Sequence, residues 1–202
     1  MKFIKYEGLT NYSISLIDME IAQENVLSGS EECVFVLEHE ALYSAGKSFE
    51  IKDFLLISDI PIYYPKRGGR VTIHSPGQLV LYPIINLKNR DINVRSYVEI
   101  LEKWIIDVLK KFDIEAYLSE DGIGVWTKGS KIGFVGIRIE KGVSSHGLCL
   151  NVSNDLDLFN AIIPCGINNA HITSMEKVLN KKIKVNDVAK KFIEMSPFLN
   201  FF

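Results

Sequence analysis

Some segments of the chain have apolar residues at the spacing of a helix, and others have them at the spacing of a strand. Between residues 94 and 112, apolar residues recur every three or four positions and form one wide face, which predicts a helix with one buried side. Asn93 stands just before this segment and is a suitable N-cap. Residues 13–27 carry isoleucines at similar spacing and are followed by Gly29, so a second helix is predicted there.

Shorter apolar runs predict strands. Residues 33–37 and 79–87 are nearly all apolar, and further strand-like runs cover 115–118, 124–127, 131–140 and 143–152. Lys141 and Gly142 provide a tight turn between the last two runs. Near the C-terminus, Thr173 and Glu176 form a candidate capping box for a short helix through residue 179, and Asn186 is a candidate cap for a final helix.

The order of these elements indicates the fold class. Helices come before, between and after clustered strands, several of which are joined by hairpins, so we expect an α+β fold with a mixed β-sheet flanked by helices. Neither a GxGxxG nor a Walker loop is present, which argues against a doubly wound nucleotide-binding sheet. With 202 residues and no clear linker, residues 1–202 are predicted to form a single domain.

Composition narrows the classes of function. The net charge is −2 and the lysines are scattered, so no nucleic-acid surface is expected. No apolar run approaches the roughly 18 residues of a membrane span, and the first residues lack the apolar core of a signal peptide. The 3 cysteines are widely spaced without a CxxC pair, which indicates neither a disulfide framework nor a metal site. We expect a cytoplasmic protein without a membrane or metal partner.

A segment rich in glycine and polar residues, Arg67 to Gln78, precedes the apolar run at 79–87. Gly68 and Gly69 lie between two arginines, and such a segment is too polar to pack as core. Glycine has no Cβ and lets the backbone come close to a ligand, so the segment is interpreted as a binding loop on a rigid strand. A hairpin tip without a ligand is the alternative.

Cys165 is the candidate nucleophile. Pro164 stiffens the chain before it and Gly166 frees the chain after it, so the thiol is presented at a turn with backbone N–H groups close enough to hold an oxyanion. A buried packing cysteine is the alternative, and it is the preferred interpretation for Cys33 and Cys149, which lie in strand-like runs.

A reactive thiol needs a group that favours the thiolate. Lys131 leads a strand that contains glycines; facing outward it is only an edge residue, whereas facing inward it is desolvated and can act as a base. His74 and His146 are the other candidates, and spacing alone leaves all three open.

Four segments, taken together and in order, resemble the lipoyl(octanoyl) transferase family, octanoyl-acyl-carrier-protein:protein N-octanoyltransferase. They are LEHEALYSAG at 37–46, RGGRVTIHSPGQLV at 67–80, KIGFVGIR at 131–138 with SHGLCLNV at 145–152, and IPCG at 163–166. Three positions depart from the family pattern without removing a catalytic group: Ser75 stands at a usual glycine, Arg70 at a frequent glutamine and Cys149 at a frequent alanine.

The resemblance implies a fold, a reaction and a site. The fold is that of the biotin/lipoate protein ligase catalytic domain. Cys165 is implied to carry the acyl group as a thioester, and Lys131 to deprotonate the thiol. The implied substrate-binding residues are Arg67, Gly68, Gly69, Arg70, Val71, Thr72, Ile73, His74, Phe134, Val135, Gly136, Gly147, Leu148 and Cys149.

The implied reaction moves an octanoyl group from octanoyl-acyl carrier protein to a lysine of apo lipoyl domains, those of 2-oxoacid dehydrogenase E2 subunits and of the glycine cleavage H protein. Thioester exchange followed by amide formation requires no ATP, metal or organic cofactor. An ATP-dependent lipoate or biotin ligase on the same fold is the alternative, and it would leave the Pro-Cys-Gly element and Lys131 unexplained. A non-catalytic module that binds lipoyl domains or the carrier is a third possibility.

Overall fold

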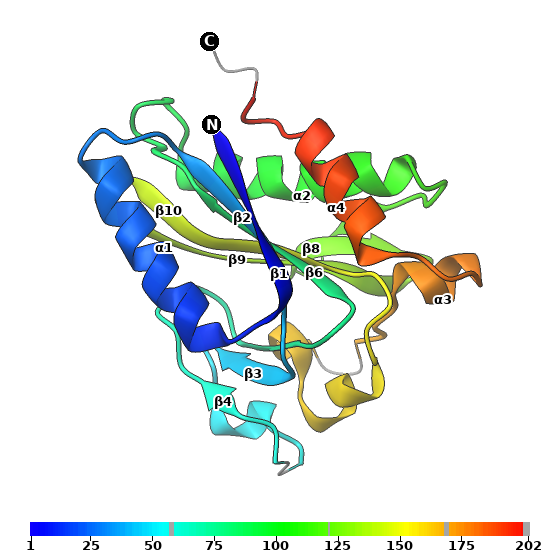
Figure 1. Cartoon of the computed structure of the whole chain (residues 1–202). Coiled ribbons are helices and arrows are strands. Elements are labelled where there is room, and N and C mark those ends of the chain that lie inside the picture. Colours follow the sequence, from blue (N-terminus) through cyan, green and yellow to red (C-terminus); the bar gives the residue numbers. More distant parts are fainter. Residues whose placement is uncertain (57–58, 121, 168–169, 200–202) are drawn as a thin grey trace.

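A large mixed β-sheet forms the centre of the protein in the computed structural model, which describes residues 1–56, 59–120, 122–167 and 170–199. The strands β1 and β2 are parallel and the other neighbouring pairs are antiparallel (Figure 1). In spatial order the seven strands are β1 (Lys2–Thr10), β2 (Cys33–His39), β6 (Gln78–Ile84), β10 (Val143–Asn151), β9 (Ser130–Glu140), β8 (Gly122–Thr127) and β7 (Tyr117–Ser119).

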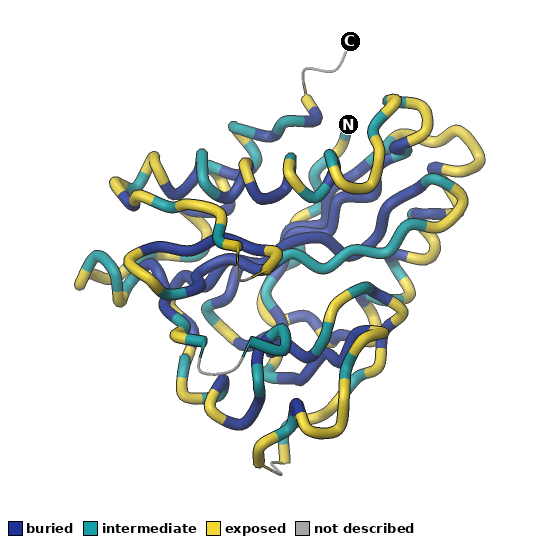
Figure 2. The backbone as a smooth tube through the Cα atoms, turned by 180° about the vertical axis from the view of Figure 1, so that it is seen from behind, coloured by how far each residue is buried: buried dark blue, intermediate teal, exposed yellow. Residues whose placement is uncertain are grey.

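The central strands are buried on both faces, as their apolar runs predict. In β2, Val34 and Val36 belong to one apolar cluster, whereas Phe35 and Leu37 belong to a second cluster across the sheet. This division follows from the alternation of side chains along a strand. Figure 2 shows the buried stretches running through the middle of the molecule, with exposed residues concentrated on the outer turns.

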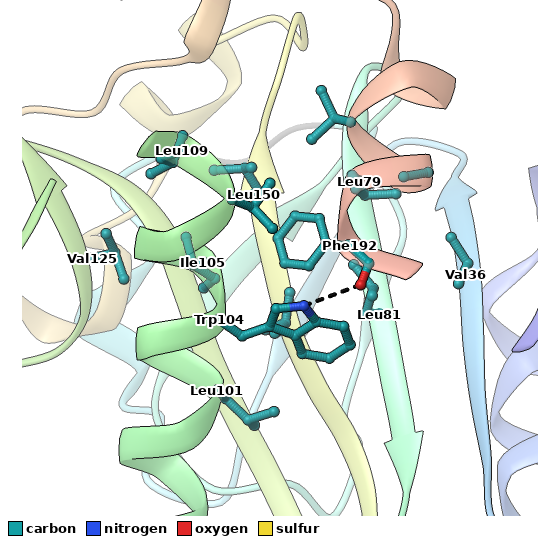
Figure 3. Close-up of a cluster of buried hydrophobic side chains, with 14 of the residues drawn as sticks. Val36, Leu79, Leu81, Leu101, Trp104, Ile105, Leu109, Val125, Leu150 and Phe192 are labelled. Atoms are coloured by element: carbon teal, nitrogen blue, oxygen red, sulfur yellow. Dashed lines mark hydrogen bonds between the residues drawn. The ribbon is translucent and has the colours of Figure 1, made fainter. Parts of the chain in front are cut away.

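Helices α2 (Val94–Lys110) and α4 (Val185–Glu194) cover one face of the sheet. Their contact is centred on Trp104, which packs edge-on against Phe192 and donates a hydrogen bond from Nε1 to the Phe192 carbonyl at 3.1 Å (Figure 3). The predicted cap of α2 is confirmed, because Asn93 accepts a hydrogen bond from the Ser96 N–H. The apolar cluster between these helices and the sheet is the larger of the two cores, and its close packing keeps the sheet rigid.

Helix α1 (Tyr12–Leu27) lies on the opposite face, against β10 and β6. The sequence predicted this helix from its isoleucines, but Ile14, Ile17 and Ile21 are each more than half exposed. The buried side instead contains Met19 and polar residues that find partners, such as Gln23, whose Nε2 donates to the Val143 carbonyl. The helix was therefore predicted from the residues of its solvent-facing side.

A small three-stranded sheet lies below the same face, in the order β4 (Ile62–Tyr63), β3 (Leu42–Ala45) and β5 (Val71–His74). Strand β5 corrects the sequence interpretation, which treated this segment as part of a polar loop unable to pack. All four residues of β5 are buried, and Thr72 and His74 lie among them. Residues 71–74 thus form a strand that pairs with β3, while residues 67–70 before it and 75–77 after it are irregular.

The remaining elements are short. Three 3₁₀ turns occupy η1 (Ile51–Asp53), η2 (Asp157–Ala161) and η3 (Pro164–Gly166). Helix α3 (Met175–Leu179) is capped by Ser174 and not by Thr173, and the Glu176 carboxylate accepts a hydrogen bond from the Ile183 N–H. Helix α4 begins after Lys184, so the predicted cap Asn186 lies within its first turn. Within the described ranges, no helix has the length and apolar character needed to cross a membrane.

Candidate active site

A cavity of about 420 Å³ lies between the large sheet and the loop of residues 67–70. This volume falls within the usual range for small-molecule sites. Every predicted site residue lines the cavity except Val71 and Ile73, whose side chains are buried in the apolar cluster behind it. The cavity also includes residues that were not among the predicted substrate-binding residues, and these are Tyr82, Val98, Gly122, Ile123, Ile137, Ile167 and His146, which the sequence offered only as a candidate base.

Cys165 lies at the wall of this cavity on the turn η3. Its backbone is in the left-handed region, with φ 56° and ψ 15°, and Gly166 continues the turn with φ 74°. A non-glycine residue in this region is strained and is often found at functional sites. The N–H groups of Gly166 and Ile167 donate to the Ile163 and Pro164 carbonyls within the turn. Neither is therefore available as the oxyanion donor that the sequence interpretation placed beside the thiol.

Burial separates the other cysteines from Cys165, which is partly exposed. Desolvation raises the pKa of the Cys149 thiol to about 12 and that of Cys33 to about 11. Both thiols are protonated at neutral pH, and a protonated thiol is a poor nucleophile. Cys33 packs in the core as predicted, whereas Cys149 also forms part of the cavity wall.

Lys131 points into the protein from the start of β9, so the interpretation as a water-facing edge residue is wrong. Its side chain is only 1% exposed, and its Nζ donates a hydrogen bond to the Ile123 carbonyl at 2.7 Å. The Lys131 Nζ lies 4.6 Å from the ring centre of Trp126 and 5.1 Å from that of Phe134. These contacts hold the amine at one position on the cavity wall.

A glycine and a carboxylate next to Lys131 complete its surroundings. Gly124 has φ 131°, and a Cβ there would lie 2.6 Å from Lys131 Cε and 3.1 Å from its Nζ. The Glu102 carboxylate from α2 accepts a hydrogen bond from the Gly124 N–H at 2.7 Å. Burial raises the pKa of Glu102, while this hydrogen bond and the charge of Lys131 act in the opposite direction. These neighbours therefore restrict the position of the amine on the cavity wall.

Arg67 anchors the loop that covers the cavity. It is buried, and its guanidinium donates to the Ser44 hydroxyl at 3.0 Å, to the Ser44 carbonyl at 2.5 Å and to the Gly68 carbonyl at 2.8 Å. The Gly68 N–H donates in turn to the Ile137 carbonyl of β9 at 2.8 Å. A Cβ at Gly136 would lie 3.3 Å from Arg67 Cδ, so glycine on the sheet allows this close approach.

Arg70 connects the loop to the turn that carries Cys165. It forms ion pairs with the fully buried Asp53 and with Glu50, and its Nε lies 3.0 Å from an oxygen of Asp53. A Cβ at Gly166 would come within 2.7 Å of Arg70 Nε, so the guanidinium lies directly against the turn. The Asp53 carbonyl accepts a hydrogen bond from the Ile163 N–H at 2.7 Å. Asp53 therefore holds both segments together.

Three histidines and two tyrosines form a cluster, of which His74, Tyr82 and His146 line the cavity. Rings of His39, His74, Tyr12, Tyr82 and His146 form a chain of contacts with centroid distances between 5.1 and 6.0 Å. Desolvation lowers the pKa of His39 to about 4, that of His146 to about 3 and that of His74 well below its usual value. These rings are neutral at pH 7 and bind protons weakly, which makes His74 and His146 poor general bases.

The sequence matches the lipoyl protein ligase A/B catalytic domain family over residues 12–195. This range contains the whole cavity. The chain belongs to that family. An octanoyltransferase of Rickettsia canadensis (strain McKiel) is 40% identical over 186 residues, which cover 88% of this chain and 89% of the relative. The identification as a member of the octanoyltransferase family, and thus as an acyltransferase, is confirmed.

Solved structures of the lipoyl protein ligase A/B and biotin ligase type share the fold. A lipoate-protein ligase A bound with ATP superposes with a TM-score of 0.72 at 13% identity, covering 96% of this chain and 83% of the other. A biotin protein ligase from Aquifex aeolicus in complex with biotin and ATP gives 0.59 at 16% identity, covering 96% and 67%. The predicted fold, a mixed sheet flanked by helices as in biotin/lipoate protein ligases, is confirmed.

Proposed function

We propose that this chain transfers an octanoyl group from octanoyl-acyl carrier protein to a lysine of apo lipoyl domains, through a thioester on Cys165. The observation that supports it most strongly is that Cys165, the less buried of the two thiols on the cavity wall, shares this apolar cavity with the buried amine of Lys131. A nucleophile and a base that share one pocket are what acyl transfer requires.

In the proposed first half-reaction, the Lys131 amine accepts the proton of the Cys165 thiol. The thiolate attacks the octanoyl carbonyl, a C–S bond to Cys165 forms, and the C–S bond to the carrier breaks. The proton then passes from Lys131 to the leaving thiolate of the carrier. One thioester replaces another, so this step is nearly balanced in free energy.

In the second half-reaction, the ε-amine of the acceptor lysine attacks the octanoyl-Cys165 carbonyl. A C–N bond forms, the C–S bond to Cys165 breaks, and the amine loses a proton that restores the Cys165 thiol by way of Lys131. Because an amide is more stable than a thioester, this step drives the overall transfer. The octanoyl chain lies meanwhile along the wall formed by Phe134 and Gly136, under the loop of residues 67–70.

The proposal also states which part of the chain is catalytic and which proteins accept the octanoyl group. Residues 1–202 act as one catalytic domain, and the acceptors are lipoyl domains of 2-oxoacid dehydrogenase E2 subunits and of the glycine cleavage H protein. The wide spacing of the 3 cysteines supports a cytoplasmic location, where thiols stay reduced.

Mass spectrometry of the intact protein after incubation with octanoyl-acyl carrier protein tests the proposal. We expect a gain of one octanoyl group, which peptide mapping places on Cys165, and its loss when an apo lipoyl domain is added. Cys165→Ala is expected to gain none and to transfer none. Cys149→Ala and Cys33→Ala are the matched controls and are expected to keep most of the activity. Transfer at a near-normal rate by Cys165→Ala would disprove the thioester, and a strict requirement for ATP would indicate a ligase.

A further inference from the structure

One side chain at the closed end of the cavity breaks the alternation of its strand. In β10, Ser144 and Leu148 face the helix α2: the Ser144 hydroxyl is 3.1 Å from the Tyr97 hydroxyl, and Leu148 belongs to the α2 core. His146 lies between them and should face the same way. Its backbone has φ 56° instead, and its ring packs 5.8 Å from Tyr82 on the opposite face. The left-handed backbone therefore turns this ring toward the cavity.

His146 is placed where a chain of about eight carbons would end. Along β9 the cavity passes Lys131, Phe134 and Gly136 and reaches Ile137. From Phe134 to Ile137 the strand advances about 10 Å. Seven carbon–carbon bonds of about 1.5 Å in a zigzag span about 9 Å. The Gly68 N–H bonds the Ile137 carbonyl at this point, and His146 is paired with Ile137 on the neighbouring strand.

A second cavity of about 200 Å³ lies behind His146, between α1 and the segment of residues 64–66. His146 lines both cavities, so its ring forms part of the wall between them. Leu16 and Met19 contribute the apolar part of the second cavity, and Lys66 and Arg138 also line it. Removing the ring would join the two spaces in one longer channel.

Met19 holds this wall in place. The His146 N–H points out of the sheet and donates to the sulfur of Met19 at 3.2 Å, and Met19 is only 1% exposed. Both ring nitrogens of His146 are buried without a hydrogen-bond partner among the described residues. In the described part of the chain, no hydrogen bond to these nitrogens therefore holds the ring, and the steric conflict with the ring is what opposes a longer chain.

We propose that His146, positioned by Met19, ends the acyl slot and sets the length of the acyl chain that the enzyme accepts. The proposal rests on the acyl transfer proposed above. It assigns His146 as a specificity residue that contacts the last carbons of the chain, and Met19 as a positioning residue. Neither takes part in the proton or acyl transfers.

The test compares acyl carrier proteins loaded with hexanoyl, octanoyl, decanoyl or dodecanoyl groups, by the rate at which each acylates Cys165 in single turnover. The variants are His146→Gly, which removes the ring and suits the left-handed backbone, and Met19→Ala, which removes the support from the side of α1. Ser145→Ala is the matched control, because Ser145 lines the second cavity but not the first. Thermal unfolding verifies that each variant is folded at the assay temperature.

We expect wild type and Ser145→Ala to prefer octanoyl over dodecanoyl. His146→Gly should raise the ratio of dodecanoyl to octanoyl rates by about tenfold or more, since burial of two further methylenes already corresponds to about that factor. Met19→Ala should shift the ratio in the same direction by a smaller factor. If wild type is octanoylated on Cys165 but the folded variants keep its chain-length profile, His146 does not end the slot. If wild type accepts no acyl group of any length on Cys165, the proposed function itself fails.

Discussion

Gly124 on β8 provides a test of how strictly the Lys131 amine must be placed. An alanine there would bring its Cβ to 2.6 Å from Lys131 Cε and equally close to the Gly133 carbonyl oxygen, whereas ordinary contacts begin at 3.4 Å. The contact with the Gly133 carbonyl must be relieved by a shift of the strand backbone, and the contact with Lys131 by a movement of its side chain by about 0.8 Å. A displacement of about 1 Å in a catalytic group costs about a hundredfold in rate. We therefore expect Gly124→Ala to slow acylation of Cys165 about a hundredfold.

The same substitution also costs stability. Alanine at φ 131° is strained by about 1–3 kcal/mol, and the close contacts add about 1–3 kcal/mol. Gly129→Ala is the matched control, because Gly129 has φ 75° but nothing within 4 Å of its missing Cβ. It should lose stability through strain alone and keep its rate.

The assay is single-turnover acylation of Cys165 by octanoyl-acyl carrier protein, followed by mass spectrometry, together with denaturant unfolding of each variant. Rates are compared at a temperature where all variants are folded. Equal acylation rates for folded Gly124→Ala and Gly129→Ala would refute the argument that the packing around the Lys131 amine governs the rate.

The remaining predictions concern the base, the energy source and pH. Lys131→Met should slow acylation about a hundredfold to ten-thousandfold at a temperature where the variant is folded. Lys131→Arg should slow it nearly as much, because guanidinium cannot accept a proton, whereas Lys103→Met at an exposed position should have no effect. Unchanged single-turnover rates would exclude Lys131 as the base. Turnover should be the same with ATP or EDTA added, and an absolute need for ATP in the steady-state assay would contradict the thioester route. The pKa of His39 is about 4 in the folded protein, against a usual value of 6.5 in the unfolded chain. The contribution of the neutral ring to stability is therefore fully present above about pH 6.5 and is lost as the pH falls toward 4. At about pH 4.5 we expect the free energy of unfolding, measured with denaturant, to be lower by about 2–3 kcal/mol for this reason, and His39→Gln should lose less stability in acid. If wild type and His39→Gln lose stability equally as the pH falls, the ring is not buried in its neutral form.

Elements with a strong period could be predicted from the sequence. Helix α2 has a wide apolar face that packs on the sheet, and strands β2 and β6 are apolar on both sides because both sides are covered. Helix α1 was predicted correctly, although its buried side contains Ser15 and Gln23 and its isoleucines face solvent. The period of the apolar residues shows that a helix is present. It shows which side of the helix is buried only when the polar residues lie on the solvent-facing side.

The elements that the sequence did not predict have buried polar residues or solvent-exposed apolar residues. Strand β5 was not predicted because His74 is polar; it is buried where its Nδ1 meets the Gln78 side chain, whose Nε2 donates to Asn151. Strand β1 lies at the edge of the sheet with much of its length exposed, so its pattern is weak. His146 entered the sequence argument only as a candidate base, since a single left-handed residue within a strand leaves no pattern in the sequence.

The link from Arg70 through Asp53 to the Cys165 turn also restricts how this site can change in evolution. Asp53 is fully buried, and its carboxylate is neutralised by the Arg70 guanidinium. A lone change of Arg70 to glutamine would leave a buried carboxylate without its cation, whereas the same change made together with Asp53→Asn would not. The two positions are therefore expected to show strong epistasis. Arginine with aspartate and glutamine with asparagine are both acceptable pairs, but each single change from one pair toward the other is unfavourable.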